Sequence, residues 1–194
     1  MFSALVLSTV VIFVAELGDK SQLMAMTFAT RYRARDVILG ITAATALVHL
    51  ASVGIGYFIG ASFEKYQGPI AILAGIAFLG FAAWTLRGDE LTDEEAQKAR
   101  KAKGSALLAV GVAFFLAELG DKTMLATITL AVRENWLGTW IGSTVGMVAA
   151  DALAIGVGAI LGRKLPEKVI TYGAAAAFAI FGLILIAEGL GWLG

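Results

Sequence analysis

The sequence predicts an all-α membrane protein with six transmembrane helices, arranged as two inverted three-helix repeats. The first observation is composition: 59% of the 194 residues are apolar and the mean hydropathy is +0.83. Soluble domains are about 45–50% apolar, and a chain this short cannot hide such an excess from water. Lipid must therefore solvate most of the surface. The second observation is that the second half of the chain repeats the first at a constant offset of 102 residues.

Apolar segments supply the six predicted helices. Each is close to the ~20 residues that cross a bilayer, and together they run roughly over 3–30, 37–60, 68–86, 105–131, 137–161 and 170–192. No Lys or Arg precedes Lys20, so we expect the first segment to be a retained helix and not a cleaved signal peptide.

One strongly polar stretch divides the chain. We expect a first three-helix repeat over 1–88, a cytoplasmic linker over 89–103 and a second, inverted repeat over 104–194. The linker is rich in both signs of charge, which is typical of a solvated connection.

The internal repeat is long and has no gap. Residues 13–31 and 115–133 are identical at 11 of 19 positions, and His49 falls opposite Asp151. Each half has three crossings, an odd number, so the second half must enter the membrane from the opposite side. Inverted repeats of this kind are common in secondary transporters, with binding sites near the midplane where the repeats meet.

Loop charges predict the orientation. Eleven of the 15 basic residues fall in the loops that follow the first, third and fifth segments, and only Lys65 and Arg133 fall on the other side. The positive-inside rule places the eleven in the cytoplasm, with both termini outside. We expect a multi-pass protein of a prokaryotic plasma membrane.

An acidic motif, Glu-Leu-Gly-Asp-Lys, occurs at 16–20 and again at 118–122, inside predicted crossings. Each charge at the bilayer centre costs about 2.5–3.5 kcal/mol on insertion scales, so these groups need partners in a shared polar cavity. In a helix, residues three apart lie on one face. The repeat axis would then bring together four carboxylates, those of Glu16, Asp19, Glu118 and Asp121.

Oxygen-rich clusters suit hard divalent cations, and the absence of Cys argues against zinc or copper. Ser21, Gln22 and Thr123 could add neutral oxygens. Four carboxylates and the charge-balancing Lys20 and Lys122 leave a net charge of −2, which one divalent cation or two protons would neutralise. We therefore hypothesise exchange of a divalent cation for protons. Ordinary i,i+4 pairs, such as Glu16 with Lys20, are the structural alternative.

His49 and Asp151 are further ionisable residues inside predicted helices, where such groups are functional candidates. Histidine titrates near neutral pH and could carry the coupled proton. The alternative is a buried, hydrogen-bonded polar pair without a role in transport.

The doubled motif, ELGDKS at 16–21 and ELGDKT at 118–123, resembles that of the Gdt-type membrane proteins, which include the MneA-type manganese exporters. Their hallmark is a twice-occurring Glu-apolar-Gly-Asp-Lys/Arg-Thr/Ser motif in two inverted three-helix halves. The resemblance covers essentially the whole chain. It implies export of Mn²⁺ or Ca²⁺ from the cytoplasm in exchange for protons, by alternating access around the motif carboxylates. The family often has Gln after the Ser/Thr; Gln22 fits, but Met124 replaces it in the second copy.

Two other functions are compatible with the pattern. A six-helix exporter of small solutes can also contain internal repeats, although paired acidic sites suit a bare cation better. An intramembrane aspartyl protease using Asp19 and Asp121 would leave Glu16 and Glu118 unexplained. We therefore expect no enzyme, no resident cofactor and no nucleic acid partner; the transported cation is a substrate, and the sequence sets no oligomeric state.

Overall fold

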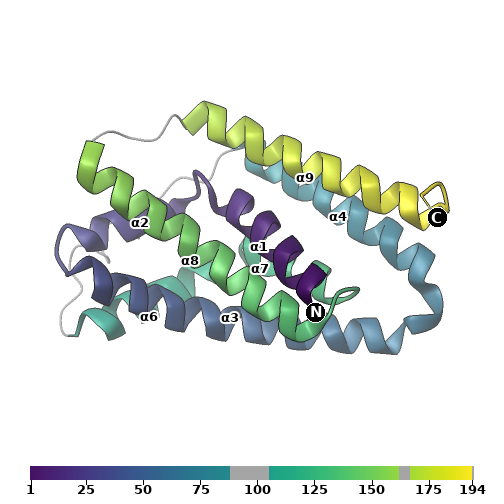
Figure 1. Ribbon diagram of the computed structural model, residues 1–194, viewed down its shortest axis with the longest axis horizontal. Coiled ribbons are helices and arrows are strands. Elements are labelled where there is room, and N and C mark those ends of the chain that lie inside the picture. The colour runs from purple at the N-terminus through teal and green to yellow at the C-terminus, as the bar shows by residue number, and fades with distance from the viewer. Residues whose placement is uncertain (88–104, 162–166, 194) are drawn as a thin grey trace.

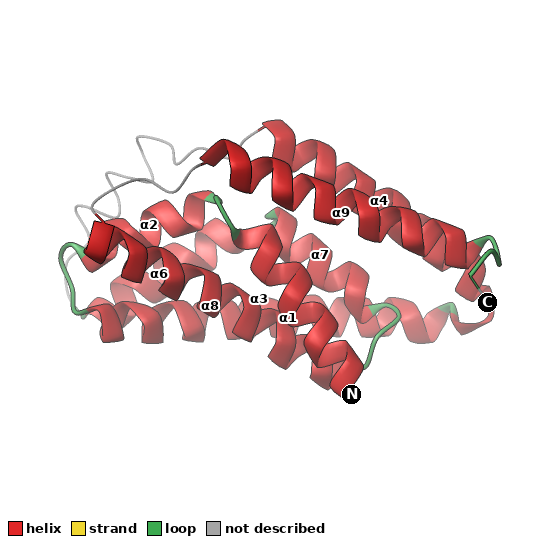
Figure 2. Cartoon of the chain, turned by 45° about the horizontal axis from the view of Figure 1, so that its top comes forward, coloured by secondary structure: helices red, strands yellow, loops and turns green. Residues whose placement is uncertain are grey.

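The computed structural model describes residues 1–87, 105–161 and 167–193, and all regular structure within these ranges is helical (Figures 1 and 2). The first half contains α1 (Phe2–Glu16), α2 (Lys20–Ala29), α3 (Ala34–Ser62), the short 3-10 helix η1 (Glu64–Tyr66) and α4 (Gln67–Arg87). The second half contains α6 (Ala106–Glu118), α7 (Lys122–Ala131), α8 (Trp136–Leu161) and α9 (Glu167–Gly189). The predicted all-α fold is confirmed, whereas the predicted linker lies outside the described residues.

Within the described ranges, four helices are long and apolar enough to cross a membrane, namely Ala34–Ser62, Gln67–Arg87, Trp136–Gly158 and Thr171–Gly189. Helices α1 and α2 together would make a fifth span, bent by 78° at the break between them. The counterpart of α1 is α6, a shorter apolar helix followed by α7. The prediction of continuous helices over 3–30 and 105–131 is therefore wrong, because both helices are interrupted at the acidic motif.

The two interruptions have the same backbone geometry. Leu17 and Leu119 are extended, Gly18 and Gly120 have φ of 77° and 81°, and each following Asp is extended again before it begins the next helix. Left-handed φ values strain any residue with a Cβ, so glycine allows the chain to leave one helix and start another within three residues. The prediction that Glu16 and Asp19 share a helix face is wrong, because the helix ends between them.

The first helix of each half packs against a helix of the other half. Helix α1 packs along α8, and α3 packs along α6 and α7, so each half covers the motif-bearing helices of the other. Glycines allow close approach at equivalent positions: a Cβ on Gly142 would lie 2.3 Å from the Leu5 carbonyl oxygen, and one on Gly40 would lie 3.2 Å from that of Leu107. Position 142 is 102 residues beyond 40, and 107 is 102 beyond 5.

Helices α4 and α9 form a separate pair along one side of the molecule (Figures 1 and 2). Their backbones nearly touch at Gly75 and Gly182, where a Cβ on either residue would lie 2.5–2.7 Å from the carbonyl oxygen of the other. Phe78 packs against Phe178 and Phe181 between these helices and the rest of the bundle. The pair is thus built as a unit beside the other helices.

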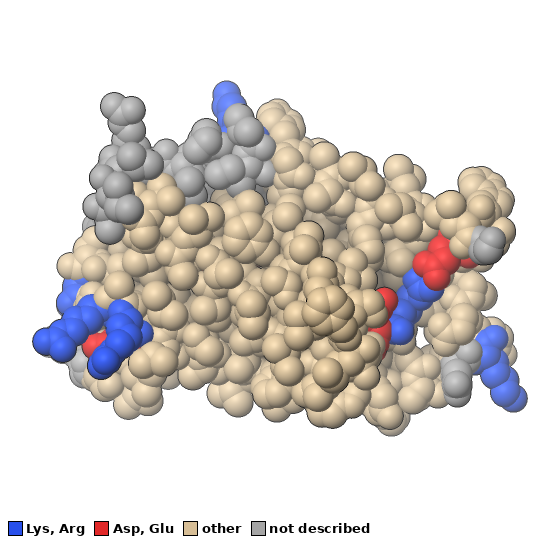
Figure 3. Space-filling view, in the orientation of Figure 1, with Lys and Arg blue, Asp and Glu red and all other residues tan. Residues whose placement is uncertain are grey.

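The two ends of the bundle carry different groups. The N-terminus and the C-terminal end of α9 lie toward one end, and the loop between α2 and α3 lies at the other (Figure 1). That loop exposes Arg31 and Arg33, and the first turn of α3 exposes Arg35; Figure 3 shows the blue cluster there. Between the ends, this face of the molecule is almost free of charged side chains (Figure 3). An uncharged belt between polar ends matches the profile of a bilayer.

Candidate functional site

The motif side chains are buried where the two broken helices meet. Glu16 and Glu118 are fully buried at the ends of α1 and α6, and Asp19 and Asp121 occupy the N-cap positions of α2 and α7. Buried charges at these positions require partners, and the opposite motif supplies them to the two aspartates.

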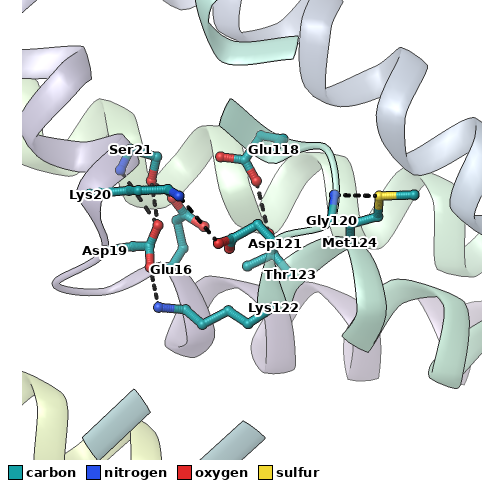
Figure 4. A network of polar contacts seen from close by, with 10 residues as sticks. All are labelled: Glu16, Asp19, Lys20, Ser21, Glu118, Gly120, Asp121, Lys122, Thr123 and Met124. Atoms are coloured by element: carbon teal, nitrogen blue, oxygen red, sulfur yellow. Dashed lines mark hydrogen bonds and ion pairs between the residues drawn. The ribbon is translucent and has the colours of Figure 1, made fainter. Parts of the chain in front are cut away.

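Each lysine reaches across to the aspartate of the other motif (Figure 4). Lys122 forms a hydrogen-bonded ion pair with Asp19 Oδ1, and Lys20 Nζ lies 3.7 Å from Asp121 Oδ1. These pairs join the two motifs and differ from the i,i+4 Glu–Lys pairs weighed from the sequence. Both lysines pair with a carboxylate of the other half, and their role in charge balance stays a prediction.

The glutamates are held by the hydroxyl groups of the motif. The Ser21 hydroxyl donates to Glu16 Oε1, and that of Thr123 donates to Glu118 Oε2 at 2.9 Å. The second oxygen of each glutamate has no hydrogen-bond partner among the described residues. A buried, unsatisfied carboxylate oxygen is costly, and these two oxygens are available to a ligand.

Both the oxygen and the nitrogen of the Gln22 side-chain amide form hydrogen bonds within the protein. Its Oε1 accepts from the Gly18 N–H at 2.8 Å, and its Nε2 donates to the Ala150 carbonyl at 2.9 Å. Met124, its equivalent, accepts from the Gly120 N–H through sulfur at 3.1 Å. Gln22 thus connects the first break to α8, and its role as a ligand stays a prediction.

His49 on α3 and Asp151 on α8 are fully buried, and their side-chain polar atoms have no hydrogen-bond partner in the part of the chain that the structure describes. The alternative of a hydrogen-bonded polar pair is therefore wrong for this arrangement. Asp151 follows Ala150, whose carbonyl holds Gln22, and so lies beside the first motif.

The carboxylates do not form a ready-made cluster. Among the described residues, no three His, Asp or Glu side chains are placed to hold one metal ion together. The expected convergence of four carboxylates thus takes another form: two lysine-paired aspartates with one glutamate beside each. Sequence reasoning missed this cross-pairing because nothing in spacing alone says which aspartate a lysine will reach.

Sequence reasoning also left Glu188 without a role. Its carboxylate accepts two hydrogen bonds from Arg133, at 2.6 and 3.1 Å, which join the end of α9 to the turn after α7. The equivalent positions in the first half are Arg31 and Leu86, so this ion pair belongs to the second half and has no equivalent in the first. Because Arg133 and Glu188 are distant in sequence, no local sequence pattern predicts their ion pair.

The chain is all-α and has several helices of membrane-spanning length. Its buried carboxylates and lysines meet where two helices break. These features define an integral membrane protein with a charged site inside its bundle. The family model described as "Divalent cation/proton antiporter GDT1" matches residues 4–93 and 106–192. The chain belongs to the GDT1 family.

Named relatives agree with this assignment. The chain is 32% identical to a putative manganese exporter of Vibrio cholerae, over 94% of this chain and 90% of that protein. It is 28% identical to a GDT1-like protein of Synechocystis, over 95% and 97% of the two chains. Identity to a PAM71 homologue of Arabidopsis thaliana chloroplasts is 33%, over 88% of this chain, which spans 55% of that relative's length. No solved structure matches the chain.

Proposed function

We propose that the protein is a secondary transporter that exports divalent cations, Mn²⁺ or Ca²⁺, from the cytoplasm in exchange for protons. The observation that carries the proposal is the pair of broken helices, which brings two acidic motifs from distant parts of the chain into one buried, cross-paired site. Family membership supports the cation and the proton, and the name of the Vibrio cholerae relative supports manganese.

The donor set fits a hard divalent cation. The available oxygens belong to Glu16 and Glu118, and the hydroxyls of Ser21 and Thr123 lie against them. Oxygen donors suit Mn²⁺ and Ca²⁺, and neither Cys nor a motif His offers the soft ligands that favour zinc or copper. Asp19 and Asp121 complete the site when their lysines turn away.

The transport cycle is alternating access between two inverted repeats. The equivalent contacts of α1 with α8 and of α3 with α6, at an offset of 102 residues, support a two-fold relation between halves 1–88 and 104–194. With six crossings, counting each broken helix once, the halves have opposite orientations. The two motifs then form the fixed centre around which the helices rock.

The orientation follows from the basic loops. The arginines of the loop between α2 and α3 lie at the end of the bundle away from the termini (Figures 1 and 3), which supports a cytoplasmic position for that loop and external termini. In a prokaryotic plasma membrane, export would then move the cation from the side of these basic loops to the side of the termini.

Protons replace the cation in the return step. The four motif carboxylates and two lysines sum to −2, and a bare charge of that size is unfavourable inside a bilayer. One divalent cation neutralises it on the outward step and two protons on the return. We place the coupled protons on the motif carboxylates, with His49 and Asp151 as the adjacent groups that relay them.

Flux measurements in proteoliposomes test this function. The purified protein is reconstituted, a pH gradient is imposed, and uptake of Mn²⁺, Ca²⁺, Mg²⁺ and Zn²⁺ is followed with an internal dye, while a second dye reports internal pH. We expect Mn²⁺ or Ca²⁺ uptake that the pH gradient drives and that moves protons the other way. Cation flux that neither responds to nor moves protons would reject exchange. Absence of flux for every cation would reject transport.

A further inference from the structure

We propose that Lys122 is a tethered competitor of the transported cation: its ammonium group holds Asp19 when the cation is absent and must leave before the cation can bind there. This inference rests on the proposed function and names a residue that sets the cation affinity. It assigns the two lysines of the doubled motif unequal parts.

Both carboxylate oxygens of Asp19 lie against polar groups of the motifs. Oδ1 accepts from Lys122, while Oδ2 lies 3.2 Å from the Ser21 hydroxyl and 3.5 Å from the Ser21 N–H. A divalent cation and an ammonium group repel each other and cannot share Oδ1. Coordination of a cation through Asp19 Oδ1 therefore requires the lysine to move.

The position of Lys122 suits a replaceable group. It is the first residue of α7, so its long side chain extends from the break after Gly120 to the opposite break. Lysine has a flexible stem and a compact charge, unlike the planar fork of arginine. A rotation of that stem removes the ammonium without moving either helix.

The second pair provides an internal comparison. Lys20 lies 3.7 Å from Asp121 Oδ1, and its side chain is 17% exposed, against 4% for Lys122. The Lys20–Asp121 pair is thus longer and less enclosed, and its Coulomb attraction is weaker at the greater separation. We infer that an entering cation meets the Asp121 side first and displaces Lys122 last.

Competition of this kind suits a carrier. The lysine neutralises Asp19 in the cation-free site, so the empty site does not expose a bare carboxylate to the apolar bundle. It also weakens cation binding, because the cation must first break an ion pair. A carrier needs binding that is strong enough to admit the ion and weak enough to release it.

The first test measures Mn²⁺ and Ca²⁺ binding to the full-length purified protein by calorimetry. Lys122→Gln is expected to lower the Kd by about tenfold or more, the range of coupling found for close charge pairs. Lys20→Gln, the matched control, is expected to lower it by less. Lys122→Arg keeps the charge and is expected to leave the Kd at or above the wild-type value, because the fork of arginine holds a carboxylate at least as tightly. An unchanged or raised Kd in a monodisperse Lys122→Gln protein would overturn the inference.

Transport supplies a readout that a purely structural clasp would not give. In proteoliposomes, Lys122→Gln should lower KM and also lower kcat, since tighter binding slows release. In Lys122→Ala, added methylammonium should occupy the vacated place and inhibit Mn²⁺ uptake, with no such inhibition in the wild type. Equal inhibition of both proteins would contradict the proposal.

The wild-type protein provides a test that does not depend on any variant folding. Lys122 and Lys20 are labelled with an amine-reactive reagent and quantified by mass spectrometry, with and without Mn²⁺. Displacement predicts that Mn²⁺ increases the labelling of Lys122; protection or no change would reject it. If the wild type binds neither Mn²⁺ nor Ca²⁺, the proposed function itself fails. If it binds them without these lysine effects, only the competitor role fails.

Discussion

Gly18 and Gly120 are the residues on which the site geometry depends. Both have left-handed φ values, and both stand between a glutamate that ends one helix and an aspartate that begins the next. For Gly120, a Cβ would meet no atom within 4 Å. The constraint at this position is therefore conformational strain and not space.

Replacing Gly120 with Ala is expected to destabilise the protein by about 1–2 kcal/mol, the cost of left-handed backbone for a residue with a Cβ. Gly156→Ala is the control, because that glycine is helical and also has open space around it. It should be neutral or slightly stabilising. Thermal unfolding of the purified proteins measures both effects, and equal melting temperatures for the two variants would refute the strain argument.

The glutamates make a second prediction at the residue scale. Glu16→Gln and Glu118→Gln should each weaken Mn²⁺ or Ca²⁺ binding by about tenfold or more, since ligand charge tunes such sites over decades of affinity. Glu188→Gln removes a carboxylate that binds Arg133 outside the motifs and should leave binding unchanged. Calorimetry on the three variants gives the comparison. A similar loss in all three would show that the effect is not specific to the site.

At the scale of the elements, the two breaks are fixed to the bundle in unequal ways. Gln22 connects the Gly18 N–H to the Ala150 carbonyl of α8, whereas Met124 accepts from Gly120 and has no proton to donate. The carbonyl equivalent to Ala150 is that of Val48, and it already accepts from the Ser52 hydroxyl at 2.8 Å.

This difference predicts an asymmetric response to exchanging the two residues. Gln22→Met should lower stability by about 0.5–1.5 kcal/mol, because the buried Ala150 carbonyl loses its donor. Met124→Gln should give little or no gain, since its potential acceptor is in use. Melting temperatures of the two variants and of the double exchange measure this. Equal and opposite shifts would indicate that both breaks are tied alike.

The α4–α9 pair allows a test of close helix packing. Gly182→Ala would place a Cβ 2.7 Å from the Gly75 carbonyl oxygen and should cost about 1–3 kcal/mol through overpacking. Gly80, the equivalent of Gly182 in the first half, has no atom within 4 Å of such a Cβ. Gly80→Ala is thus the matched control and should not lower the melting temperature. Comparable losses in both would contradict the packing described for this pair.

At the scale of the whole molecule, the sequence was sufficient for the helical class, because hydropathy reports which segments lipid can solvate. The doubled motif and its 102-residue register also located the buried acidic residues correctly. The breaks at Gly18 and Gly120 were missed since an apolar run reads as helix, and one glycine in it is usually tolerated. The pairs of Lys20 with Asp121 and of Lys122 with Asp19 depend on which helices touch, and helical spacing carries no such information.

Pairs of equivalent positions, 102 residues apart, allow the inverted topology to be tested. Arg33 and Asn135 occupy equivalent positions in the two halves, at exposed sites just before α3 and α8. The chain has no cysteine, so Arg33→Cys and Asn135→Cys each introduce a single thiol on an unreactive background. In intact cells, an impermeant maleimide should label Asn135→Cys and should reach Arg33→Cys only after permeabilisation. Labelling of both from the same side would reject the inversion.

The reciprocal ion pairs bear on how such a chain could have arisen. Residue 20 meets residue 121, and residue 122 meets residue 19, which is the self-complementary contact of a two-fold homodimer. The ion pairs between the halves therefore have the symmetry of a two-fold interface between two equivalent units. Under the proposed inversion, such units would have had to insert in both directions, which a strong bias of basic loops forbids. The bias of eleven basic loop residues to two fits a chain in which the halves are joined, because one orientation can then be selected for both.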